Sequence, residues 1–335
     1  MADTEEPLHD IAHLGHVELL TPKPNESLWY FKDILGMEMV HQEGQSVYLR
    51  AYGDYATTTL KLSEAEGAGI GHIAWRTTSP QALERRAAAI EATGLGIGWM
   101  NGDFGHGKCY RFNDPDGHAM EVYYDEERYQ PPEHLRSTLM NLPMKYPKDG
   151  VGVRKTDHVA VLCQDVARNR EFATNALGLK LREQVMYENG TAEIGSWMSS
   201  GAVHHELAYV VDVKGASGRL HHYSLWVDDQ AEVLRAANIL REHNVFIEAG
   251  PSKHNNSQAF YLYSYEPGGN RVEIYTSGFF VLAPDFEPVI WDEETRGPGV
   301  YWGAALPDSF LNYATPVIDD AGAKPDGNAP VIDVL

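Results

Sequence analysis

Four short stretches decide the fold of this chain, because each is a strand-like segment with a histidine near its start. They are GHVELL (15–20), GHIAWR (71–76), DHVAVL (157–162) and HHYSLW (221–226). Apolar residues alternate or cluster after each histidine, which is typical of a β-strand with a buried face. A segment that recurs in this way predicts a structure assembled from copies of one unit.

A helical stretch follows the first and the third of these segments. NESLWYFKDILG (25–36) and DVARNREFATNALG (165–178) are amphipathic, and both end on a glycine. Glycine is common just beyond the last turn of a helix, because it adopts a left-handed backbone conformation without a penalty. The glycine lies the same number of residues after the histidine in both stretches, which supports a duplication.

The second and fourth units also end alike. NDPDGHAMEVYY (113–124) and YEPGGNRVEIYT (265–276) are Pro/Gly turns that lead into a strand with a central glutamate, Glu121 or Glu273. The chain therefore looks like a paired duplication, with two units in residues 13–125 and two in residues 155–278.

This pattern resembles the vicinal oxygen chelate fold of glyoxalases, bleomycin-resistance proteins and extradiol dioxygenases. The resemblance implies an α+β protein in which four βαβββ modules pair into two partly open β-barrels. We expect an N-terminal domain (1–130), a Pro-rich linker (131–150), a C-terminal domain (151–280), and an extension and tail (281–335) whose polar end, from Asp319, is mobile.

The composition excludes some classes of partner. Lys and Arg total 27 against 48 Asp and Glu, which gives a net charge of -21. Nucleic acids and anionic membranes need a cationic surface, so neither is expected as a partner. No apolar run is long enough for a membrane helix and the first residues lack a signal-peptide pattern, so we expect a cytoplasmic protein. Cys109 and Cys163 predict two ordinary buried thiols.

Both halves carry two histidines and one glutamate in register with the repeat. The sets are His16, His72 and Glu121 in the first half and His158, His222 and Glu273 in the second. Two imidazoles and one carboxylate on one face form the facial triad of non-haem Fe(II) oxygenases, and this donor set also suits Mn(II). Three coordination positions stay open, which a catecholate and O2 would fill.

Acid–base residues accompany only the second triad. The stretch VHHELAY (203–209) predicts a strand that carries His205, with His204 as the competing candidate, and His254 and Tyr263 precede Glu273. Aligned positions in the first half are Thr58 for His205 and Arg111 for Tyr263. Oxygen chemistry needs proton delivery, so we expect the reaction in the second half. The first triad is interpreted as a vestigial, hydrogen-bonded polar cluster, with a second metal site as the alternative.

Longer motifs resemble type I extradiol dioxygenases, in particular catechol 2,3-dioxygenase and homoprotocatechuate 2,3-dioxygenase. These motifs are GRLHHYSLW (218–226), QAFYLYSYEPGGNRVEIYTSG (258–278) and VIWDEETRGPGVYWG (289–303). The resemblance covers almost the whole chain and implies a homotetramer. It also implies that His222, and not His221, binds the metal with His158 and Glu273. His205 would donate a proton, Tyr263 and His254 would hydrogen-bond the substrate and oxygen, and Trp197 would line the pocket.

The same resemblance bears on the substrate. Ala249 stands where relatives that act on acidic catechols carry an arginine, and Arg296 alone is left of a later arginine pair. An unpaired carboxylate in a partly dry pocket is costly, so we expect a neutral catechol, including methyl- or halogen-substituted ones, with O2 as co-substrate. Lys253 leaves a carboxylated catechol such as homoprotocatechuate as an alternative. Two other functions stay open, a glyoxalase-type metalloisomerase and a metal-free binding module.

Overall fold

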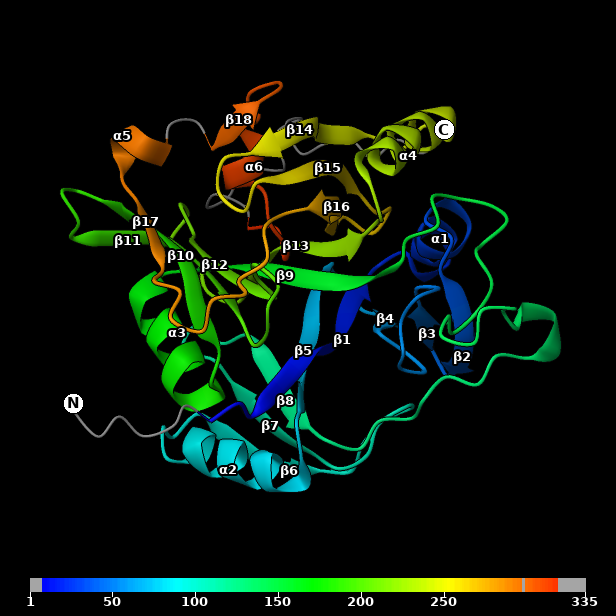
Figure 1. The fold of residues 1–335 in the computed structure, drawn as a ribbon, viewed down its shortest axis with the longest axis horizontal. Helices are drawn as coiled ribbons and strands as arrows, with labels where there is room; N and C mark the ends of the chain where they lie inside the picture. Colours follow the sequence, from blue (N-terminus) through cyan, green and yellow to red (C-terminus); the bar gives the residue numbers. More distant parts are fainter. Residues whose placement is uncertain (1–7, 297–298, 319–335) are drawn as a thin grey trace.

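The computed structural model describes residues 8–296 and 299–318, which form two large mixed sheets (Figure 1). The first sheet contains β1 (Ile11–Thr21), β2 (Glu38–Glu43), β3 (Ser46–Arg50), β4 (Leu60–Glu64), β5 (Gly69–Thr77), β6 (Gly96–Met100), β7 (Cys109–Asn113) and β8 (Ala119–Tyr123). The second contains β9 (Lys155–Cys163), β10 (Lys180–Tyr187), β11 (Ala192–Ser199), β12 (Leu207–Val211), β13 (Arg219–Trp226), β14 (Ile247–His254), β15 (Ala259–Tyr265), β16 (Arg271–Ser277), β17 (Val289–Trp291) and β18 (Val300–Trp302).

The strands form four consecutive groups of four, and in each group one helix connects the first strand to the second. The predicted four βαβββ modules are therefore confirmed. These helices are α1 (Pro24–Trp29), α2 (Pro80–Glu91), α3 (Val166–Phe172) and α4 (Gln230–Glu242). Each lies on the outside of its sheet, and α2 covers the first sheet at the lower edge of Figure 1. The chain is therefore α+β, as predicted.

The two predicted helix ends at glycine are confirmed, with a π-helical turn added before each. The turns are η1 (Tyr30–Ile34) after α1 and η3 (Ala173–Leu177) after α3. Gly36 and Gly178 follow with φ of 79° and 94°. This left-handed conformation favours glycine, which explains why both stretches end on that residue.

The strand order places the histidine strands at the centre of each sheet. In the second sheet the order runs β12-β9-β13-β16-β15, and in the first it runs β4-β1-β5-β8-β7. Strands β9 and β13 are antiparallel neighbours, and β13 pairs in parallel with β16. Three adjacent strands therefore carry His158, His222 and Glu273, which explains how residues far apart in the sequence meet.

The C-terminal extension contributes two strands to the second sheet. Strand β17 adds to β10 and β18 adds to β14, one at each edge. The extension also contains α5 (Glu293–Arg296) and α6 (Ser309–Asn312), and the segment between the sheets contains a short 3-10 helix, η2 (Glu133–Leu135). The exact domain boundaries stay predictions, and the tail from Asp319 lies outside the described residues.

One continuous core joins the two halves. Its buried side chains come from both sheets, and the Tyr30 hydroxyl in η1 hydrogen-bonds Ser264 in β15 at 2.7 Å. Cys109 and Cys163 are buried and unpaired, as predicted. Among the described residues, no helix combines the length and apolar character needed to cross a bilayer.

Candidate metal centre and substrate pocket

Three predicted ligands converge in the second sheet. His158 Nε2 lies 3.1 Å from His222 Nε2 and 2.9 Å from Glu273 Oε2, and His222 Nε2 lies 3.5 Å from the same oxygen. All three side chains are buried. Burial alone would raise the pKa of Glu273, but the charge and hydrogen bond of His158 outweigh it and hold that pKa well below its ordinary value. The arrangement is a group that can hold one metal ion.

Neighbouring residues fix which nitrogen of each histidine faces this centre. His158 Nδ1 donates to Asp157 Oδ2 at 2.9 Å. His221 Nε2 donates to the Phe310 carbonyl at 2.7 Å, so its Nδ1 is free to accept from His222 Nδ1 at 2.6 Å. Both ligand histidines can therefore present an unprotonated Nε2 to a cation. Orienting contacts of this kind are typical of metal-binding histidines.

A cavity of about 330 Å³ opens on one side of the three ligands. Its wall is mainly apolar and comes from β9 to β16 and from the C-terminal extension. The apolar lining residues include Val185, Ile194, Val211, Val213, Leu306, Phe310 and Leu311. The volume lies at the lower end of the range for ligand pockets, about 300–1,000 Å³, and suits one substituted aromatic ring.

His205 lines this cavity and His204 does not contribute to its lining. The His205 ring lies 3.9 Å from the His158 ring, centroid to centroid. His204 instead contacts Glu183, with Nε2 3.3 Å from Oε2, and its Nδ1 lies 2.7 Å from His205 Nδ1. Both residues precede β12, so they stand in a loop and not on the strand that the sequence indicated. Burial lowers the pKa of His205 well below its ordinary value.

The other predicted pocket residues also line the cavity. His254, Tyr263 and Trp197 all contribute to its wall. His254 Nε2 and the Tyr263 hydroxyl are 3.1 Å apart, and His254 Nε2 lies 3.7 Å from Glu273 Oε1. His254 is also stacked on Tyr261, with ring centroids 3.8 Å apart. The structure thus brings every predicted site residue to the same cavity.

Positions that would bind a substrate carboxylate are not cationic. Ala249 is covered by apolar and aromatic side chains, Tyr261, Tyr263, Phe310 and Leu306. Lys253 points elsewhere, with Nζ 5.7 Å from the centre of the Tyr301 ring. Among the described residues that line the cavity, none is lysine or arginine. The side chain of Arg296 lies outside what the structure describes.

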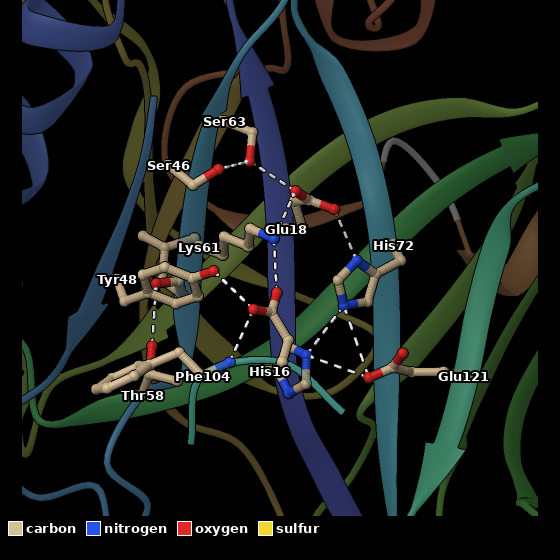
Figure 2. Close-up of polar contacts among 12 residues, drawn as sticks. His16, Glu18, Ser46, Tyr48, Thr58, Lys61, Ser63, His72, Phe104 and Glu121 are labelled. Carbon is tan, nitrogen blue, oxygen red and sulfur yellow. Dashed lines mark hydrogen bonds and ion pairs between the residues drawn. The ribbon is translucent and has the colours of Figure 1, made fainter. Parts of the chain in front are cut away.

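The first sheet repeats the triad geometry. His16 Nε2 lies 2.9 Å from His72 Nε2 and 3.4 Å from Glu121 Oε1 (Figure 2). The residue that faces the glutamate is of a different type in the two sheets. Arg111 faces Glu121 across β7 and β8, where Tyr263 faces Glu273 across β15 and β16. Its Nε lies 2.5 Å from Glu121 Oε2. The position aligned with His205, Thr58, donates its hydroxyl to the Leu49 carbonyl.

Sequence reasoning missed three kinds of partner. Asp157 was signalled only by its place next to His158. The contact of His221 with the Phe310 carbonyl joins residues that are distant in the chain, so no local sequence pattern predicts it. His106, which lies 3.5 Å from Glu121 Oε1, falls outside the repeated histidine motif.

A family model covers most of the chain. The Glyoxalase/Bleomycin resistance protein/Dioxygenase superfamily matches residues 13–122 and 155–274, which correspond to the two pairs of modules. The chain is 44% identical over 324 residues to the metapyrocatechase of Geobacillus stearothermophilus, covering 96% of this chain and 98% of that protein. It is 39% identical over 297 residues to a manganese-dependent 2,3-dihydroxybiphenyl 1,2-dioxygenase of Geobacillus genomosp. 3, covering 88% and 94%.

Solved structures give the same architecture. The 2,3-dioxygenase LapB from Pseudomonas sp. KL28 superposes with a TM-score of 0.79 at 25% identity, covering 85% of this chain and 98% of that one. Homoprotocatechuate 2,3-dioxygenase from Brevibacterium fuscum gives a TM-score of 0.79 at 23% identity, covering 93% and 94%, and supports the fold alone. With the converging histidines and glutamate of the second sheet, these matches show that the chain belongs to the type I extradiol dioxygenases of the glyoxalase/bleomycin resistance protein/dioxygenase superfamily.

Proposed function

We propose that the chain cleaves catechol and neutral substituted catechols with O2 to 2-hydroxymuconic semialdehydes. His158, His222 and Glu273 would hold Fe(II), and His205, Tyr263 and His254 would act on the bound substrate. The observation that carries this proposal is the position of the triad at the wall of an apolar cavity that these acid–base residues also line.

The donor atoms fit a divalent cation. Glu273 Oε2 is buried, and two imidazole nitrogens lie within 3.5 Å of it. Three donor atoms gathered this closely in a buried site are stabilised by a cation between them. Held by His158, His222 and Glu273, the metal would supply Lewis-acid chemistry that lowers the pKa of catechol hydroxyls, and redox chemistry with O2.

Iron is the first candidate, since two imidazoles and a carboxylate are the Fe(II) facial set, and manganese is the second. One relative is named as manganese-dependent. Reconstitution of the metal-free protein with each metal in turn, followed by turnover of catechol, distinguishes the two.

His205 would move a proton in this proposal. Its low pKa keeps the imidazole neutral at pH 7, so it can accept the proton that a catechol hydroxyl releases on binding. It can return that proton later, when oxygen chemistry needs an acid. The Tyr263 hydroxyl, whose pKa is raised well above its ordinary value by burial, stays protonated and can donate to a developing negative charge.

Neutral catechols are expected to be far better substrates than acidic ones. Catechol and its 3- or 4-methyl and chloro derivatives should exceed homoprotocatechuate and protocatechuate in kcat/KM by about 100-fold, because an unpaired carboxylate costs several kcal/mol to desolvate. The measurement is the absorbance of the yellow semialdehyde across this panel with the Fe(II)-loaded enzyme.

Lys253→Ala provides the matched control for this panel. Lys253 does not line the cavity, so the preference should be the same in the variant. Equal kcat/KM for acidic and neutral catechols in the wild type would contradict the proposed substrate class. If the variant alone lost the acidic substrates, Lys253 would be identified as their partner.

The two rival functions fit the site less well. In the glyoxalase-type alternative a second carboxylate ligand is expected at the position that His205 occupies. A metal-free binding module would have no need for two oriented histidines and a buried glutamate around one point. The homotetramer and the cytoplasmic location that the resemblance implies stay predictions.

A further inference from the structure

A second group of metal-ligating side chains lies inside the first sheet. His16 comes from β1, His72 from β5, Glu121 from β8, and His106 from the loop before β7. His16, His72 and Glu121 point toward one another in Figure 2. Their side chains are almost fully buried, as is that of His106, which is 3% exposed. None of these four residues contributes to the wall of the substrate cavity described above.

The distances fit a single small cation. Glu121 Oε1 lies 3.4 Å from His16 Nε2, 3.5 Å from His106 Nε2 and 3.8 Å from His72 Nε2. Ligand atoms that sit about 2.0–2.1 Å from a tetrahedral Zn(II) are roughly 3.3 Å apart. Each imidazole therefore lies near the distance from the carboxylate oxygen that a shared metal would impose. His16, His106 and Glu121 form a group that can hold an ion.

Two of the histidines are oriented as ligands. His72 Nδ1 donates to Glu18 Oε2 at 2.8 Å, and His106 Nδ1 donates to the Gly107 carbonyl at 3.0 Å. A neutral imidazole that uses Nδ1 as a donor presents a lone pair at Nε2, the atom that faces Glu121. His106 Nε2 also accepts a long hydrogen bond from the Asp103 N–H, at 3.3 Å.

Arg111 does not fill the centre of the cluster. It contacts Glu121 Oε2, whereas the imidazoles gather at Oε1. Oε1 is buried and has no hydrogen bond from any described residue. A carboxylate that gives one oxygen to a metal and the other to an arginine is an ordinary second-sphere arrangement. The arginine therefore positions Glu121 and leaves the oxygen that points at the histidines without a proton donor.

We propose that this cluster is a second metal site, a closed structural one for Zn(II), formed by Glu121 with His16, His106 and His72. A closed set of four protein ligands is typical of structural zinc, whereas catalytic sites keep a position open. The second-sheet triad has three ligands and an adjacent cavity, and this cluster has four candidate ligands away from it. The ion would tie β1, β5 and β8 together and would take no part in ring cleavage.

Zinc stoichiometry in a protein without the second-sheet triad tests the proposal. His158→Ala/His222→Ala removes that triad, and the protein is stripped with a chelator, dialysed against excess Zn(II), gel-filtered and analysed by mass spectrometry. It should retain about one zinc per chain. Adding His16→Asn or His106→Asn should reduce this to nearly none. Adding His41→Asn should change nothing, because His41 stacks on Phe104 and lies outside the cluster.

Co(II) substitution and the wild-type background make the result independent of one variant's folding. The triad-free protein loaded with Co(II) should show the visible absorption of a tetrahedral nitrogen–oxygen site. The otherwise wild-type His106→Asn protein should lose one metal equivalent and keep its iron. A folded triad-free protein that retains no zinc, or zinc that is unaffected by both His16→Asn and His106→Asn, would overturn the proposal.

Discussion

Replacing His158, His222 or Glu273 with alanine is expected to remove most of the bound iron and to abolish ring cleavage. Each residue supplies one of only three proposed ligand atoms, and the three atoms lie within 3.5 Å of one another. Loss of a contact that merely orients a ligand already weakens metal binding about 10–100-fold, so loss of a ligand itself should cost more. Iron content per chain and turnover of catechol measure both effects.

His16→Ala is the matched control, because His16 occupies the equivalent position in the first sheet. This variant should keep about one iron per chain and turn over catechol at a rate close to that of the wild type. If His16→Ala and His158→Ala lost iron equally, the assignment of the reaction to the second sheet would be wrong.

His205→Ala or His205→Phe is expected to retain iron and to bind catechol anaerobically with little change in Kd. His205 lines the cavity beside His158 but does not belong to the group of three ligands. Its proposed role is proton transfer, which typically contributes about 10²–10⁴-fold, so kcat should fall within that range. More O2 should also be consumed per semialdehyde formed, since the oxygen chemistry lacks its acid.

His204→Ala distinguishes the two neighbouring histidines. His204 touches His205 and Glu183, so its loss should disturb the orientation of His205 and lower kcat by about 10-fold or less. Stopped-flow mixing of each anaerobic enzyme–catechol complex with O2 measures the step directly. A stalled oxygen step in His204→Ala together with a normal one in His205→Ala would reverse the two roles. Loss of iron in both variants would rule out a pure acid–base role for His205.

Much of the fold could be predicted because the sequence contains four copies of one structural unit. The histidine segments became the central strands of the two sheets, and Gly36 and Gly178 end the helical stretches that precede the outer strands. The π-helical turns before these glycines were not predictable, because such turns are rare and neither stretch carries a residue pattern that distinguishes them from an α-helix. The same holds for β17 and β18, which are short and gain their pairing only from the edges of the second sheet.

The site was predictable where it follows the repeat and not where it depends on contacts across the chain. His158, His222 and Glu273 could be identified because they occupy equivalent positions of the repeat. The acid–base residues His205, His254 and Tyr263 then distinguish this triad from the first. The Phe310 carbonyl orients His221 and through it His222, but a backbone oxygen leaves no trace in a sequence motif. His106 likewise reaches Glu121 from a loop, so only the folded chain shows it as a fourth candidate ligand in the first sheet.

Product identity after a single turnover tests the central claim most directly. Fe(II)-loaded wild-type protein is mixed anaerobically with one equivalent of 4-methylcatechol and then exposed to ¹⁸O2, and the product is analysed by absorbance and mass spectrometry. The account predicts a yellow methyl-substituted 2-hydroxymuconic semialdehyde that carries oxygen from O2. A colourless muconic acid, formed by cleavage between the two hydroxyl-bearing carbons, or unchanged catechol would contradict it.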